Sequence, residues 1–157
     1  MTASVRNVTF DCADPWALSA FWQEATGYPR HPDDVPGDDG AALVAPDGAG
    51  PALLFLRVPE GKSAKNRLHL DLQPDTGRDQ ETDRLIVLGA RMVDDRRLPD
   101  GQGWVVLADP EGNEFCVVRS AAERAATTPP APQRVAAPEA SQQQVGLEDP
   151  ATEPPLG

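Results

Sequence analysis

The chain has 157 residues, 39% of them hydrophobic, which is enough for one domain with an ordinary core. Its formal net charge of −11 arises from 25 acidic and 14 basic residues, and it lacks the Lys/Arg footprint of a protein that binds nucleic acid or an anionic membrane. There is neither a signal-like amino terminus nor a stretch approaching the roughly 18 apolar residues of a membrane span, so we expect a cytoplasmic protein.

The first strand is predicted at residues 5–12, where apolar and polar side chains alternate. One face is apolar and carries Val8, Phe10 and Cys12. The other face is polar and carries Asn7, Thr9 and Asp11. A helix follows, with Asp14 as its N-cap, Pro15 at its first position and Gly27 at its end. Shorter extended runs are predicted at 28–31, 41–45 and 52–58.

The second half follows the same order of elements. A strand is predicted at 67–72, then a helix capped by Thr76 that ends at Gly89. Three further strands are predicted at 90–94, 103–108 and 114–119. Shifting the sequence by 62 places aligns the two halves without a gap. In this alignment Val8 matches Leu70 and Gly27 matches Gly89. The pattern predicts an α+β fold of two tandem βαβββ modules with eight strands.

The domain is predicted to cover residues 1–120, with modules at about 4–59 and 66–120. From residue 121 the chain is rich in Pro, Ala and Gln, and 121–157 is expected to be a flexible carboxy-terminal tail that starts with at most a short helix over 121–126. The only cysteines, Cys12 and Cys116, lie in strand-like segments and are expected to be reduced thiols.

Strand alternation also predicts where a site forms. Leu68, Leu70 and Leu72 should face the helices, which leaves His69 and Asp71 on the opposite face. If the polar faces of both halves turn toward one another, a cupped mixed sheet results, and polar side chains that converge in a concavity are what a small-molecule site requires. The residues expected to bind a ligand are Asn7, Thr9, Asp11, His69, Asp71, Trp104, Glu114 and Cys116.

Several motifs resemble the glyoxalase-like branch of the vicinal oxygen chelate superfamily, which includes glyoxalases, bleomycin resistance proteins and extradiol dioxygenases. They are the segments 9–15 (TFDCADP), 68–72 (LHLDL) and 109–116 (DPEGNEFC). The resemblance spans residues 4–120 and implies the two-module fold and a homodimer. By itself, the turn at 109–113 is interpreted as a tight hairpin without chemistry.

The resemblance implies one divalent metal ion, held by the first and last strand of each module. Carried over to this chain, the ligand positions are Asn7, Leu54, His69 and Cys116. Only His69 is a usual ligand there, although Cys116 would suit zinc, so no cofactor is expected. A replacement set of His69, Asp71 and Glu114 lacks a second histidine, because His31 is placed in an edge or loop segment.

Three interpretations of the polar cup are open. His69 and Asp71 form part of a satisfied polar layer without further function. Alternatively, the cup is a metal-free pocket that binds or sequesters an organic ligand, which is the interpretation we favour. In the third, the chain is a lyase, isomerase or dioxygenase-type enzyme in which His69 is a metal ligand or general acid or base, oriented by Glu114 or Asp11. A nucleophilic Cys116 is disfavoured, because neighbouring carboxylates raise a thiol pKa.

Overall fold

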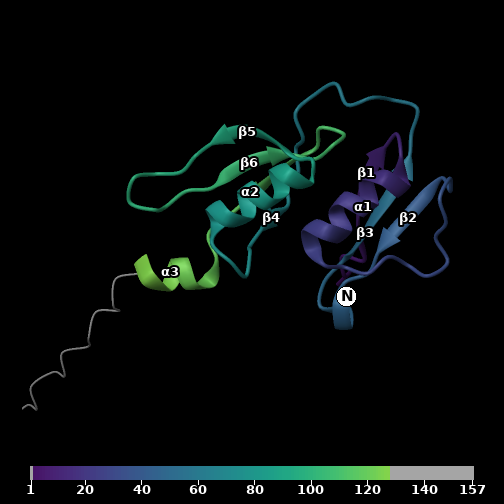
Figure 1. Ribbon diagram of the computed structural model, residues 1–157. Coiled ribbons are helices and arrows are strands. Elements are labelled where there is room, and N and C mark those ends of the chain that lie inside the picture. The colour runs from purple at the N-terminus through teal and green to yellow at the C-terminus, as the bar shows by residue number, and fades with distance from the viewer. Residues whose placement is uncertain (1, 128–157) are drawn as a thin grey trace, which may run out of the picture.

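The computed structural model describes residues 2–127, which form two modules side by side (Figure 1). The first contains β1 (Asn7–Cys12), α1 (Pro15–Thr26), β2 (Gly40–Leu43), a 3-10 turn (Pro46–Gly48) and β3 (Ala52–Arg57). The second contains β4 (Asp71–Leu72), α2 (Arg78–Leu88), β5 (Arg91–Asp95), β6 (Val105–Ala108), β7 (Glu114–Val117) and α3 (Ala121–Thr127). The fold is α+β, as the sequence predicted.

The two sheets have the same topology. Their strand orders are β1-β3-β2 and β4-β7-β6-β5, and in each module the first strand is parallel to the last. Thr9 pairs with Leu54 in the first sheet and Asp71 pairs with Cys116 in the second, so both partners shift by the same 62 positions. The 62-residue repeat in the sequence therefore corresponds to the same pairing of first and last strands in both modules.

Two predicted strands are largely absent from the sheets. The run at 28–31 makes one antiparallel bridge, between Arg30 and Leu43, because Pro29 and Pro32 on either side have no N–H to donate to a ladder. The run at 67–72 is paired as a strand only at Asp71–Leu72. In residues 2–127 the two sheets contain seven strands and this one bridge, whereas the sequence predicted eight strands.

The local sequence predicts both ends of α1 but not the cap at the start of α2. Asp14 caps α1 by accepting from the Ala17 N–H at 3.1 Å, and the αL residue Gly27 ends it, as predicted. The predicted Thr76 cap of α2 is wrong, since α2 starts after Gly77. The free N–H of Arg78 instead donates to the Glu123 carboxylate of α3 at 3.0 Å, a cap from 45 residues along the chain.

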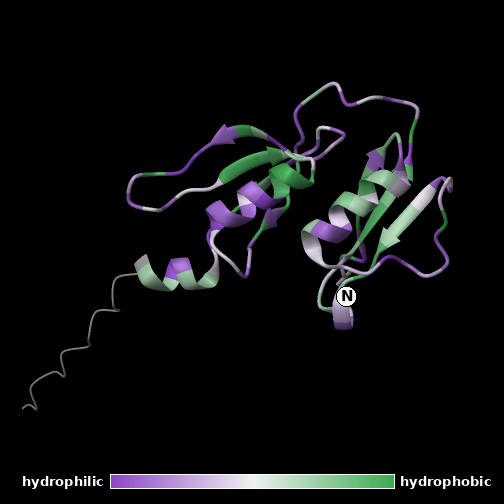
Figure 2. Cartoon of the chain, in the orientation of Figure 1, coloured by the Kyte–Doolittle hydropathy of each residue, from purple (hydrophilic) through white to green (hydrophobic). Residues whose placement is uncertain are grey.

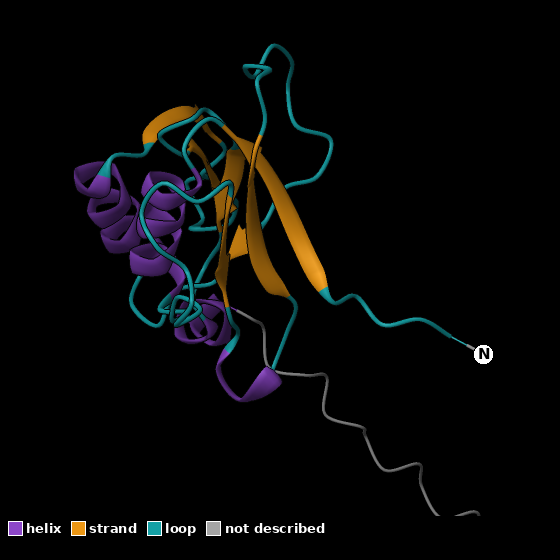
Figure 3. Ribbon diagram, turned by 90° about the vertical axis from the view of Figure 1, so that its right-hand side faces the viewer, coloured by secondary structure: helices purple, strands orange, loops and turns teal. Residues whose placement is uncertain are grey.

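The helices lie on one side of the strands and leave the other side of both sheets uncovered (Figure 3). Figure 2 shows β3 and β6 as apolar strands, whereas the first turns of α2 are hydrophilic. Within residues 2–127, no helix is long and apolar enough to cross a membrane. The rest of the predicted tail, residues 128–157, lies outside the described residues.

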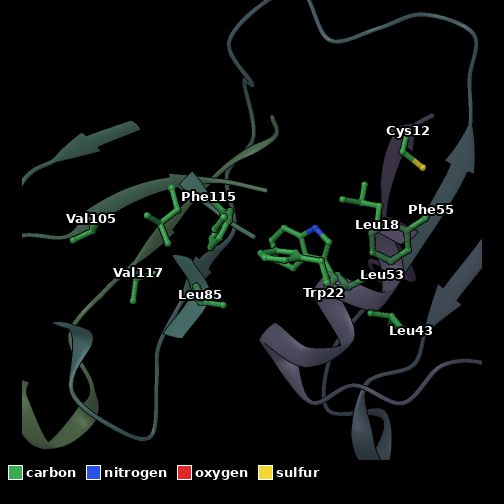
Figure 4. Packing of buried hydrophobic residues seen from close by; sticks show 13 residues of the cluster. Cys12, Leu18, Trp22, Leu43, Leu53, Phe55, Leu85, Val105, Phe115 and Val117 are labelled. Atoms are coloured by element: carbon green, nitrogen blue, oxygen red, sulfur yellow. The ribbon is translucent and has the colours of Figure 1, made fainter. Parts of the chain in front are cut away.

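One aromatic cluster joins the modules. Trp22 of α1 is fully buried and its ring centroid lies 5.1 Å from that of Phe115 in β7 and 5.0 Å from that of Phe10 in β1. Figure 4 shows the Trp22 ring between Phe115 of the second module and Leu18 and Phe55 of the first. Trp22 is therefore part of the core, and the two modules share a single core.

Candidate functional site

The turn at 109–113 connects the modules, in addition to closing the β6–β7 hairpin. Asp109 is 2% exposed and accepts from the indole N–H of Trp22 at 3.1 Å. The same carboxylate accepts from the backbone N–H groups of Glu111 and Asn113 at 3.0 and 2.9 Å. Its charge is therefore satisfied by donors from both modules.

Glu111 makes the second connection. Its two carboxylate oxygens accept from the N–H of Ala13 at 2.7 Å and of Asp14 at 2.9 Å, where the chain enters α1. A negative charge there also interacts favourably with the amino-terminal end of the helix dipole. The turn thus has a function that its interpretation as an isolated hairpin missed, since it fixes the first module against the second.

A slot of about 250 Å³ opens beside this junction. Its inner wall is apolar and includes Phe10, Trp22, Leu70 and Phe115. The remaining lining residues come from β1, from the segment 66–68 and from the start of β7, and they are Val8, Thr9, Asp11, Asn66, Arg67, Leu68, Asn113 and Glu114. An apolar interior with a few polar groups is the usual composition of a small-molecule site.

The segment 66–69 lies beside the slot without pairing to β7. The contact between β4 and β7 begins at Leu70, whose carbonyl accepts from the Cys116 N–H at 2.9 Å. Before it, the Asn66 N–H donates to the side-chain carboxylate of Glu114 at 3.0 Å. Leu68, which was predicted to face the helices, is 65% exposed and lines the slot.

Glu114 is fixed in its charged state. Lys62 of the linker between the modules lies 3.0 Å from its carboxylate, whose side chain is only 13% exposed. Burial alone would raise the pKa of Glu114, but the Asn66 N–H and the Lys62 ammonium outweigh burial and lower this pKa to about 2. Glu114 is therefore ionised at neutral pH and already has two partners, which does not suit a general acid.

His69 contacts neither of the carboxylates predicted to orient it. Its Nε2 atom lies 2.7 Å from the ammonium of Lys65, four residues earlier. Because a lysine ammonium only donates, Nε2 acts as the acceptor in this contact. The slot lining includes neither His69 nor Asp71, whereas Thr9, Asp11 and Glu114 of the predicted ligand residues are brought together there.

The remaining predicted ligand residues lie apart from the slot. Asn7 shares a second concavity, of about 390 Å³, with Leu54 and His31 on the uncovered face of the first sheet. Trp104 is 45% exposed, just before β6. Cys116 is a buried free thiol beside Asp71 in the β4–β7 pair. The eight side chains therefore do not form a single cluster.

The residues at the four predicted metal positions do not fit a divalent ion. Leu54 has no donor atom, and Asn7 offers only a neutral amide. Burial, followed by the nearby Asp71 charge, raises the pKa of the Cys116 thiol to about 11, so without a metal ion it is protonated at neutral pH. Across residues 2–127, no group of three His, Cys, Asp or Glu side chains is placed to hold a metal ion.

The sequence interpretation missed the linker. Lys62, Asn66 and Arg67 all contact the slot or its rim, but none was predicted as a site residue. One signal was present, because the only two lysines of the chain, Lys62 and Lys65, lie within four residues of one another between the modules. Their partners depend on the path of the linker, which no local pattern specifies.

Comparisons with known proteins agree with this architecture. Residues 7–118 match a family model described as a glyoxalase-like domain. No curated protein matches the chain. Among solved structures, a glyoxalase/bleomycin resistance protein/dioxygenase family enzyme from Burkholderia phytofirmans is 21% identical, with a TM-score of 0.57 over 73% of this chain and 97% of that one.

Two further solved structures have a similar fold. A variant of the fosfomycin resistance protein FosX from Listeria monocytogenes, in complex with Mn(II) and a dihydroxypropylphosphonic acid, is 18% identical with a TM-score of 0.59, covering 79% of this chain and 95% of that one. Lactoylglutathione lyase from Agrobacterium tumefaciens is 19% identical with a TM-score of 0.51, covering 74% of this chain and 93% of that one.

Proposed function

We propose that this chain, which belongs to the family of glyoxalase-like domains, binds a small organic molecule in the slot between its two modules without using a metal ion. The observation that carries the proposal is the slot itself, with aromatic walls and a polar rim at the junction of the two sheets. A cavity of about 250 Å³ has room for a molecule built around one six-membered ring.

The proposal that the site works without a metal ion rests on the residues at the four metal-ligand positions that the family resemblance implies. The aliphatic side chain of Leu54 removes one of the four donors, and Asn7 offers only a neutral amide. The Glu114 carboxylate in the slot lining is held by Lys62 and Asn66 and is not free to coordinate an ion. Binding by apolar contact and hydrogen bonds requires none of these ligands.

An acid or base role for His69 is the weaker proposal. The imidazole has no carboxylate to orient it, since its Nε2 contacts Lys65, and it lies outside the slot lining. A general base must come within hydrogen-bond reach of the proton that it removes. Binding without turnover is therefore the function that this geometry supports best.

A variant that fills the slot tests the proposal. Thr9 is exposed on the uncovered face of β1 and lines the slot, so Thr9→Trp is expected to fold and to block ligand entry. Benzoate, benzamide and phenol should shift the backbone amide signals of Thr9, Asn66 and Phe115 in NMR titrations of the wild type, and Thr9→Trp should weaken binding by about tenfold or more.

The matched control is Ala20→Trp, which adds the same side chain at an exposed position of α1. It should bind all three probes as the wild type does. If none of the probes produces saturable shifts in the wild type, or if Thr9→Trp binds them unchanged, the slot is not the binding site.

A further inference from the structure

The linker between the modules concentrates positive charge in an acidic protein. Three cations, Lys62, Lys65 and Arg67, occur within six residues, in a chain of net charge −11. The linker passes over the junction of the two sheets (Figure 1), and Arg67 lines the slot directly. Positive side chains at the mouth of an apolar slot favour a ligand that combines an apolar group with a negative charge.

The charges at the slot are not mutually neutralised. Lys62 is paired with Glu114, but no carboxylate in residues 2–127 forms an ion pair with Lys65 or Arg67. Of the two acids that line the slot, Glu114 is held by Lys62 and Asn66, which leaves Asp11. Nearby Glu111 is bound to the amides of Ala13 and Asp14. At the slot, Arg67 is thus a cation without an ion-pair partner and Asp11 is the one such carboxylate, while Lys65 lies two residues before Arg67 in the same linker.

From these charges we infer that the ligand of the slot is a small carboxylate, with its apolar body against the aromatic wall and its charge held by Arg67, and with Lys65 adding to the positive charge of the linker nearby. The inference rests on the proposed function and adds the ligand class to it. A guanidinium suits this task because its planar donors match the two oxygens of a carboxylate. Asp11 acts against the ligand and limits its affinity.

Benzoate and benzamide test the inference, since they have the same shape and differ in charge. At low ionic strength the wild type should bind benzoate about threefold to fivefold more tightly than benzamide, the range expected of a partly exposed ion pair. Arg67→Gln should remove this preference by weakening the binding of benzoate more than that of benzamide. Asp11→Asn should increase the affinity for benzoate, and added salt should reduce the preference.

Arg6→Gln is the matched control, because Arg6 lines the second concavity with Asn7 and not the slot. It should keep the preference for benzoate. Equal binding of both probes by the wild type, or a preference that survives in Arg67→Gln, would overturn the carboxylate inference and leave the slot as the binding site. Binding of neither probe would overturn the inference together with the proposed function.

Discussion

Replacing Asp109 by alanine should lower the free energy of unfolding by about 3–5 kcal/mol, the range for removing one partner of a buried charged network. The substitution leaves the indole N–H of Trp22 and the backbone N–H groups of Glu111 and Asn113 without their acceptor. Asp109 is 2% exposed, so water does not readily replace it. Urea denaturation followed by circular dichroism measures the loss.

Two controls separate the network from a general effect of losing an aspartate. Asp83→Ala removes an exposed aspartate of α2 and should change stability by less than about 0.5 kcal/mol. In a double-mutant cycle, Asp109→Ala and Trp22→Phe should couple by about 1–2 kcal/mol, because each removes the same hydrogen bond. A loss below about 1 kcal/mol for Asp109→Ala, or additive effects in the cycle, would show that this contact does not hold the modules together.

Replacing Arg78 by alanine should cost about 2–4 kcal/mol, through a different part of the fold. Arg78 is 5% exposed, and its Nη1 donates to the carbonyls of Gly101, Gln102 and Gly103 at 3.3, 3.2 and 3.0 Å. These carbonyls belong to the loop between β5 and β6, so the guanidinium fixes that loop against the start of α2. Thermal and urea unfolding of the variant measure the loss.

Arg78→Lys should recover less than half of the lost stability, because an ammonium lacks the planar set of donors. The control is Arg84→Ala on the same helix, whose partner Glu81 lies one turn away. That ion pair is partly exposed, so its loss should cost less than about 1 kcal/mol. Equal costs for Arg78→Ala and Arg84→Ala would mean that the buried carbonyl contacts contribute little.

The fold was predictable because its signals are local and periodic. Alternation in 5–12 placed Phe10 in the core and Thr9 on the open face, and Asp14 and Gly27 marked the ends of α1. The 62-residue repeat then supplied the module order. The α2 cap was not predictable, because its acceptor, Glu123, is distant in sequence and is brought close only by the complete second module.

The candidate site was predictable only in part, for the same reason. Strand alternation correctly placed Thr9, Asp11 and Glu114 at one concavity. It wrongly assumed that 67–72 pairs along its whole length, and the exposed Leu68 shows where pairing stops. Before that point the Asn66 N–H is bound by the Glu114 side chain, a contact that the alternation of side chains along a strand does not predict.

The central claim is that the slot binds its ligand without a metal ion. It is tested most directly by NMR titration of the metal-stripped chain with benzoate and benzamide, first in EDTA and then with Zn²⁺ in place of the chelator. We predict saturable shifts of the Thr9 and Asn66 amides in EDTA, with a dissociation constant that Zn²⁺ leaves unchanged. Binding that is absent in EDTA, appears with Zn²⁺ and disappears again in His69→Ala would contradict the account.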